Sequence, residues 1–166
     1  MGLGVLVVSG IGLAQLARFT VPFRFRELFE RHGQAAGVSP NLLHAIAWHE
    51  SGLQPGVVSN PNRDGTRDFG LMQVNERNFS VLGLTPQTAL DPDVSVRAAA
   101  RLLADIQRTH PGTADALAIY NAGPARDGGP KLTATGAYIN QEYVRAVLVR
   151  YQLLQLAALA PVQRTA

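Results

Sequence analysis

Cysteine is absent from this 166-residue sequence, and the absence removes several classes of chemistry. Without cysteine the chain can have no disulfide framework, no zinc site built on thiolates and no thiol nucleophile. The absence of cysteine does not tell whether the protein works in an oxidising or a reducing compartment. A chain of this length buries roughly 70% of its unfolded surface and can fold without disulfides in either. Charged residues are also few, at 16% against 46% apolar residues. This balance excludes a disordered chain and fits one folded domain.

Basic residues outnumber acidic residues, but no run of them is present. The formal net charge is +3 and the isoelectric point is near 9.8. The only lysine is Lys131, and the arginines are scattered without interleaved aromatic residues. A nucleic-acid-binding surface concentrates its basic residues, so we expect no nucleic-acid partner and interpret the arginines as a solvated surface.

The first 19 residues form an apolar N-terminal segment that lacks the leading positive charge of an export signal. Residues 2–17 are apolar or small except Ser9 and Gln15, and no lysine or arginine precedes Arg18. A helix needs about 20 apolar residues to cross a bilayer, so we expect no stable membrane span. Three interpretations remain: a signal peptide, a start codon assigned too far downstream, or a buried helix. We favour export, which predicts a periplasmic protein of the bacterial cell envelope.

Helix signals dominate the rest of the chain and predict a mainly α domain over residues 20–152, with at most a small β-ribbon. Cap and breaker residues suggest helices from Thr20-Val21-Pro22 to Gly37, from Ser39-Pro40 to Gly52, from Asp91-Pro92 to His110, from Thr113 through Tyr120, and from about Ala137 to Leu159. Residues 153–166 form an apolar C-terminal helical extension and tail. We expect it to pack against the domain or the N-terminal segment, with docking to a partner as the weaker alternative.

Glu50 is the strongest candidate for acid–base chemistry. It lies near the C-terminal end of an apolar helix, after Trp48 and His49. A glutamate at a helix end is usually a solvated surface residue. Here, however, burial and the negative end of the helix dipole would both favour the protonated form, which a general acid requires near neutral pH.

The segment after Glu50 offers groups suited to a sugar. Gly70 permits close backbone approach, and Met72 offers an adaptable apolar contact. Gln73 and Asn75 supply paired donors and acceptors for acetamido and hydroxyl groups.

Two other motifs, for a zinc site and for a phosphate-binding loop, are incomplete, and the place of His44 is undecided. Position 53 is leucine where a zinc-protease helix beginning His49-Glu50 needs its second histidine, so we expect no metal site. The glycine-rich stretch 123–131 breaks the spacing of a phosphate-binding loop at Gly129-Pro130. His44 is interpreted as a surface or satisfied core histidine, with a place near the cleft left open.

Four short motifs, taken in order, resemble the signatures of the soluble lytic transglycosylase (SLT) domain. They are Glu50-Ser51, Gly70-Leu71-Met72-Gln73, Ala118-Ile119-Tyr120-Asn121-Ala122-Gly123 and Tyr143-Val144. The third departs mildly from the family, whose usual run is alanine-alanine-tyrosine. The likeness spans about Val38 to Tyr151 and implies a lysozyme-like, goose-type helical fold. In length and layout the sequence is most similar to the small members that open the cell wall for secretion, conjugation or pilus machines.

The resemblance implies a peptidoglycan lytic transglycosylase that needs no cofactor. The substrate would be cut between N-acetylmuramic acid and N-acetylglucosamine, leaving 1,6-anhydro ends, with Glu50 acting first as acid and then as base. Ser51 would position Glu50, Tyr143 would hydrogen-bond near it, and Asn121 would fix its loop. The expected substrate-binding set is Ser51, Gly70, Met72, Gln73, Asn75, Tyr120, Asn121 and Tyr143. The expected partners are glycan strands and components of a cell-envelope machine.

Asp68 keeps other functions open. The segment from Asp64 to Asn75 also resembles the active-site hairpin of animal-type lysozyme, in which the corresponding aspartate is the second catalytic carboxylate. Retaining glycosidases place two carboxyl groups about 5 to 5.5 Å apart, which would allow a hydrolytic muramidase using Glu50 and Asp68. Asp68 could instead cap a turn or pair with Arg67. An alternative of another class is a non-catalytic peptidoglycan-binding assembly module, against which the acid and all four motifs argue.

Overall fold

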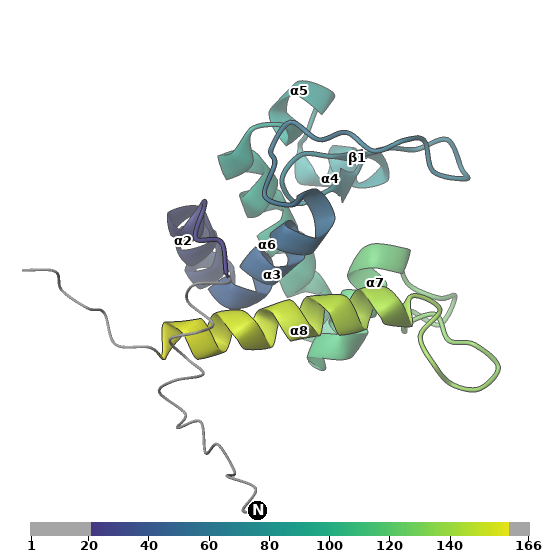
Figure 1. Cartoon of the computed structure of the whole chain (residues 1–166). Coiled ribbons are helices and arrows are strands. Elements are labelled where there is room, and N and C mark those ends of the chain that lie inside the picture. Colours follow the sequence, from purple (N-terminus) through teal and green to yellow (C-terminus); the bar gives the residue numbers. More distant parts are fainter. Residues whose placement is uncertain (1–20, 160–166) are drawn as a thin grey trace, which may run out of the picture.

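The computed structural model describes residues 21–159 and shows a helical domain with one short hairpin (Figure 1). In chain order the elements are α2 (Arg26–Ala36), α3 (Pro40–Ser51), β1 (Asp68–Phe69), β2 (Val74–Asn75), the 3₁₀ helix η1 (Glu76–Asn78), α4 (Phe79–Leu82), α5 (Pro86–Ala89), α6 (Pro92–Thr109), α7 (Thr113–Ala122) and α8 (Gln141–Ala158). The predicted mainly α fold with a small ribbon is confirmed. The apolar segment 1–19 and residues 160–166 of the predicted tail lie outside the described residues. Between residues 21 and 159, no helix combines the length and apolarity that a membrane span requires.

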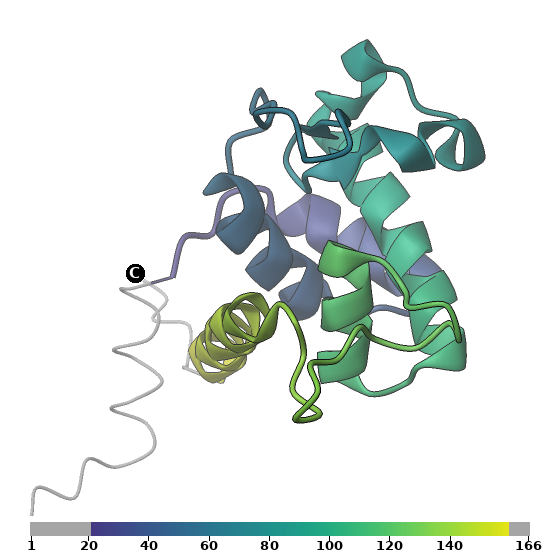
Figure 2. The same cartoon turned by 90° about the vertical axis from the view of Figure 1, so that its right-hand side faces the viewer.

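Helix α3 is the centre of the hydrophobic core. Every residue from 42 to 47 is buried, so this helix is covered all round instead of along one stripe. Helices α2 and α8 pack against α3. Helix α6 contacts α3 as well, and it also packs against α2 and α7. Helix α8, seen almost end-on in Figure 2, lies alongside α3. Glu50, in the last turn of α3, is therefore held by a rigid helix.

Side-chain caps start η1, α5 and α6, and backbone conformation sets other helix boundaries. Asp91 accepts a hydrogen bond from the Val94 N–H at 3.0 Å, which starts α6 at Pro92 as predicted. Helix α2 begins at Arg26 and not at Pro22, because Phe25 has a left-handed φ of 63° that no α-helix contains. Helix α7 includes Thr113, predicted as its cap, and the preceding glycine takes the cap position.

The hairpin is locked onto the helical body by a glycine. Strands β1 and β2 are antiparallel, with Asp68 opposite Asn75. Gly70, in the connecting turn, has a φ of 75°, and a Cβ atom built on it would lie 2.0 Å from the Ala89 carbonyl oxygen. The Met72 N–H donates to the Ser95 hydroxyl at 3.2 Å, which ties the same turn to α6. Only glycine allows this close approach, so the hairpin position depends on Gly70.

The loop between α7 and α8, residues 123–140, is fastened to α7 at three points. Lys131 Nζ donates to the Ala122 carbonyl at 2.5 Å. The Tyr138 hydroxyl donates to Asp115 Oδ1 at 2.6 Å, and Asn140 Nδ2 donates to the Ala118 carbonyl at 3.1 Å. These bonds hold the loop beside the C-terminal end of α7, where it forms part of the wall of the cavity described next.

Candidate active site

A cavity of about 710 Å³ opens between the hairpin, α6 and the C-terminal end of α7. Its volume is typical of a ligand site, which ranges over about 300–1,000 Å³. The sequence-predicted residues that line it are Glu50, Asp68, Gln73, Asn75, Tyr120 and Asn121. Three segments far apart in the sequence thus meet at one place, as the resemblance to the SLT domain implies.

Glu50 reaches the cavity from the last turn of α3. The helix ends at Gly52, which has a left-handed φ of 60°, so Glu50 lies at the negative end of the helix dipole. The pKa of Glu50 is raised from 4.5 to about 7, mainly by burial and in smaller part by the negative charge of Asp68. The Tyr143 hydroxyl acts in the opposite direction and lowers the same pKa. About half of the Glu50 side chains are therefore protonated at pH 7, so the form that a general acid requires is well populated.

Two tyrosines face Glu50 from α7 and α8. The Tyr120 hydroxyl donates to the Met72 carbonyl at 2.9 Å, which fixes the ring against the hairpin. Burial, followed by the charges of Glu50 and Asp68, raises the pKa of Tyr120 well above its usual value. The Tyr143 hydroxyl is buried and has no well-formed hydrogen bond with any residue of the described range, so it acts on Glu50 as a nearby dipole. That hydroxyl is free to donate to the carboxylate when Glu50 loses its proton.

Ser51 holds the end of α3 against the hairpin. Its buried hydroxyl donates to the Leu71 carbonyl at 2.8 Å and accepts from the Gln54 N–H at 3.2 Å. Ser51 does not line the cavity. This geometry suits the positioning part predicted for Ser51 and gives no support to a direct contact with substrate.

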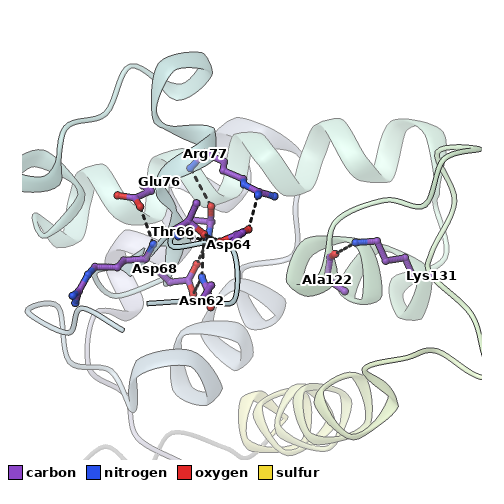
Figure 3. A network of polar contacts seen from close by, with 10 residues as sticks. Asn62, Asp64, Thr66, Asp68, Glu76, Arg77, Ala122 and Lys131 are labelled. Carbon is purple, nitrogen blue, oxygen red and sulfur yellow. Dashed lines mark hydrogen bonds and ion pairs between the residues drawn. The ribbon is translucent and has the colours of Figure 1, made fainter. Parts of the chain in front are cut away.

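Asp68 sits on β1 in a set of neutral hydrogen-bond donors (Figure 3). Asn75 Nδ2 donates to Asp68 Oδ1 at 2.8 Å, and Asn62 Nδ2 donates to Asp68 Oδ2 at 3.1 Å. The alternative pairing of Asp68 with Arg67 is not formed, because the Arg67 guanidinium donates to the Ser59 carbonyl at 3.1 Å. The structure therefore places Asp68 in the cavity with its carboxylate held by side-chain amides.

Gln73 and Asn75, both predicted to bind a ligand, have different hydrogen-bond partners in the structure. Gln73 has a left-handed φ of 47°, and its Nε2 donates to the carbonyls of Val57 and Gly70 at 3.1 and 2.9 Å. Both amide hydrogens are thus used within the protein, so Gln73 has its oxygen left to accept a bond from a ligand. Asn75 also donates to Thr66 Oγ1 at 3.0 Å, so its part is to orient Asp68.

Besides Ser51, three predicted substrate contacts lie outside the cavity lining, whereas Asn121 lines it. Met72 is completely buried and belongs to the core, and Gly70 is buried against Ala89, so neither lines the cavity. Tyr143 lies behind Glu50, also outside the lining. Asn121 lines the cavity at its rim, where its Oδ1 accepts from Asn140 Nδ2 at 2.8 Å and steadies the loop.

Sequence reasoning missed the far wall of the cavity. Val94, Ala98, Leu102 and Ile106 recur every four residues, a spacing that predicts one apolar face of α6. The structure shows Leu102 and Ile106 lining the cavity. Helical spacing reveals an apolar face without saying whether a neighbour or a cleft covers it. The other unpredicted lining residues are Asn62, Asp64, Val74, Arg77, Asn78, Asp105, Thr109, His110, Ile119, Ala122, Gly123, Pro124 and Gly128. Residues 21–159 include no group of three or more side chains able to hold a metal ion.

Comparison with known proteins confirms the resemblance noted in the sequence. A family model described as the transglycosylase SLT domain matches residues 27–141. The invasion protein IagB of Salmonella typhimurium is 32% identical over 122 residues, which are 71% of this chain and 71% of that protein. The peptidoglycan transglycosylase gp16 of Escherichia phage T7 is 33% identical over 120 residues, which are 69% of this chain and 9% of gp16.

A solved structure shares the fold. The 70 kDa soluble lytic transglycosylase SLT70 from Escherichia coli superposes with a TM-score of 0.67 at 17% identity, covering 93% of this chain and 32% of SLT70. The chain thus spans about a third of that enzyme. The match to the family model and the likeness to IagB over most of both chains together show that this chain belongs to the family of transglycosylase SLT domain proteins.

Proposed function

We propose that this protein is a peptidoglycan lytic transglycosylase, which cuts between N-acetylmuramic acid and N-acetylglucosamine and leaves 1,6-anhydromuramic ends. The observation that carries the proposal is Glu50, a carboxyl group with a pKa of about 7 at the wall of a 710 Å³ cavity. Membership of the SLT family supports the reaction, and the name of the phage relative, a peptidoglycan transglycosylase, supports the substrate.

In the first step Glu50 acts as a general acid. Protonated Glu50 gives its proton to the glycosidic oxygen, and the bond between that oxygen and C1 of the muramic sugar breaks. The 2-acetamido oxygen of the same sugar attacks C1 as the leaving group departs, so the positive charge is shared over a bicyclic oxazolinium ion. Glu50 is left as a carboxylate, and Tyr143 can then donate a hydrogen bond to it.

In the second step the same carboxylate acts as a general base. Glu50 takes the proton of the muramic 6-hydroxyl, and O6 attacks C1 while the bond from C1 to the acetamido oxygen breaks. The 1,6-anhydro ring forms, the acetamido group is restored and Glu50 regains its proton. A pKa near the working pH suits both steps, because a group with such a pKa gives and accepts a proton at similar cost.

The proposal also covers where in the cell the enzyme acts. The chain matches IagB, an invasion protein, over 71% of both sequences. Together with the apolar segment 1–19, this supports an exported enzyme that opens the wall locally for a secretion, conjugation or pilus machine. A partner would then be a component of that machine, and the glycan strands would be the substrate.

Product analysis tests the reaction. Purified sacculi are digested with the wild type and with Glu50→Gln, and the released muropeptides are weighed by mass spectrometry. We expect wild-type products one water lighter than reducing ends, and no products from Glu50→Gln at unchanged fold. Reducing ends from the wild type would establish a hydrolase instead. Wild-type rates from Glu50→Gln would remove Glu50 from the mechanism.

A further inference from the structure

No well-formed hydrogen bond within residues 21–159 fixes the direction of the Tyr143 hydroxyl, although this hydroxyl is buried and acts on Glu50. Tyr120 differs, because its hydroxyl is held by the Met72 carbonyl at 2.9 Å. A hydroxyl without such a partner is directed by what packs on its ring. The contacts of the Tyr143 ring therefore decide whether its hydroxyl faces the Glu50 carboxyl group.

The histidine that precedes Glu50 supplies one of these contacts. The ring centres of His49 and Tyr143 lie 5.0 Å apart with their planes at 76°, an edge-to-face arrangement that aromatic pairs prefer. His49 and Glu50 are neighbours in the last turn of α3, whereas Tyr143 lies in the first turn of α8. One turn of α3 thus carries the carboxyl group and also contacts the tyrosine that acts on it.

A second contact between the same two helices supports the first. Arg150 lies seven residues after Tyr143, on the same face of α8. Its guanidinium carbon lies 5.3 Å from the centre of the Trp48 ring, and its Nη1 donates to the Ala146 carbonyl at 3.0 Å. Consecutive residues of α3, Trp48 and His49, are therefore both held by α8, which runs alongside α3 (Figure 2).

His49 is an uncharged residue that does not reach the substrate cavity. Burial lowers its pKa, and the positive charge of Arg150 lowers it as well. Its Nδ1 is buried and has no hydrogen-bond partner among the described residues. The side chain is absent from the cavity lining. What His49 offers to the reaction is therefore its contact with Tyr143.

We propose that His49 is a positioning residue of the transglycosylase reaction, whose ring holds the Tyr143 ring so that the tyrosine hydroxyl faces the Glu50 carboxyl group. This inference rests on the proposed function. When Glu50 gives its proton to the glycosidic oxygen, the Tyr143 O–H donates a hydrogen bond to the carboxylate that forms. Neither His49 nor Tyr143 makes or breaks a covalent bond, and both keep their protons. A hydrogen bond to a charged group is stronger than one between neutral groups, so a misdirected hydroxyl costs most in this step.

Two substitutions separate the aromatic contact from the filling of space. His49→Leu has a similar volume and keeps water out, but it has no flat ring to pack on Tyr143. His49→Phe is the conservative variant that restores the aromatic pair, and its larger ring has room because His49 is only partly buried. At saturating sacculi we expect kcat to fall about fivefold in His49→Leu and to be rescued to within about twofold of the wild type in His49→Phe. KM should stay within about twofold in both, since His49 does not line the cavity.

A titration shows whether the effect reaches Glu50. The groups that face Glu50 are Asp68 from β1, Tyr120 from α7 and Tyr143 from α8, and both substitutions leave them in place. The Tyr143 hydroxyl lowers the pKa of Glu50, so a hydroxyl that turns away should let this pKa rise. In His49→Leu we expect the ¹³C NMR midpoint of the Glu50 carboxyl carbon and the alkaline limb of the pH–kcat profile to move upward. In His49→Phe both should stay at their wild-type positions.

A double-mutant cycle shows whether His49 acts through Tyr143. In Tyr143→Phe the hydroxyl is gone, so nothing remains for His49 to direct. Adding His49→Leu to Tyr143→Phe should therefore change kcat by less than about twofold and leave the Glu50 midpoint where Tyr143→Phe puts it.

Three results would overturn the inference. They are a wild-type kcat and midpoint in folded His49→Leu, equal losses in His49→Leu and His49→Phe, and a loss from His49→Leu that persists in the Tyr143→Phe background. The midpoint is measured without substrate, so this test is separate from product analysis, in which reducing ends from the wild type would overturn the proposed function instead. If His49→Leu does not show a cooperative thermal transition, His49→Gln, which also lacks an aromatic ring, is put through the same comparison.

Discussion

Replacing Glu50 with glutamine should stabilise the fold in a pH-dependent way. The folded protein holds the pKa of Glu50 at about 7, against 4.5 for the free group. The unfolded chain therefore releases this proton first, so the contribution of Glu50 to stability is fully present below pH 4.5 and is lost as the pH rises to 7. Each pKa unit corresponds to about 1.4 kcal/mol, which gives a loss of about 3 kcal/mol. Because Glu50 opens on one side to the cavity, we expect about 2 kcal/mol.

The assay is urea unfolding of the wild type and Glu50→Gln between pH 4 and pH 8.5. Every other titrating group is common to both proteins, so the difference between their unfolding free energies isolates Glu50. We expect this difference to increase in favour of the variant from pH 4.5 through 7 and to level off above about pH 8. A difference that is flat across the whole range would refute the raised pKa and, with it, the reason for treating Glu50 as an acid.

Three further predictions concern Tyr143, Gly70 and His44. Tyr143→Phe removes a buried hydroxyl without a good partner, so the free energy of unfolding should change by less than about 1 kcal/mol. The same change should raise the pKa of Glu50 and move the alkaline limb of the pH–kcat profile upward, and a downward move would contradict the account. Gly70→Ala places a Cβ atom 2.0 Å from the Ala89 oxygen at a φ of 75°, and should cost at least about 3 kcal/mol in urea unfolding; wild-type stability would show that the hairpin shifts freely. Burial lowers the pKa of His44 to about 4, so the unfolded chain binds this proton first and stability should fall by up to about 3 kcal/mol from pH 6.5 to 4. His44→Leu should abolish that part of the acid loss in unfolding at pH 7 and pH 4.5, and an unchanged acid loss would assign it to other groups.

Helix boundaries were predictable where one residue type sets them. Asp91 caps α6 through its side chain, and Pro40 takes the first position of α3, whereas the Ser39 side chain forms no capping bond. The start of α2 was not predictable, because the left-handed backbone of Phe25 comes from tertiary packing and not from any preference of phenylalanine. Local chemistry thus reveals an element, while its exact end can depend on the rest of the fold.

The motifs located the site but did not separate chemical from structural residues. Glu50 and Gln73 line the cavity, whereas Met72, from the same motif as Gln73, is entirely buried. One short sequence has to shape the turn, fill the core and face the ligand at once, and its residue types do not tell these tasks apart. The wall from α6 was missed for a related reason, since Leu102 looks like any other core residue of an amphipathic helix.

The proposed reaction depends on the raised pKa of Glu50, which leaves about half of these carboxyl groups protonated at pH 7. Its most direct test is a ¹³C NMR titration of the side-chain carboxyl carbons in protein labelled at glutamate, with the Glu50 signal assigned by its loss in Glu50→Gln. We predict a midpoint of about 7 for that signal. A midpoint near 4.5, the value of a free glutamate, would contradict the account.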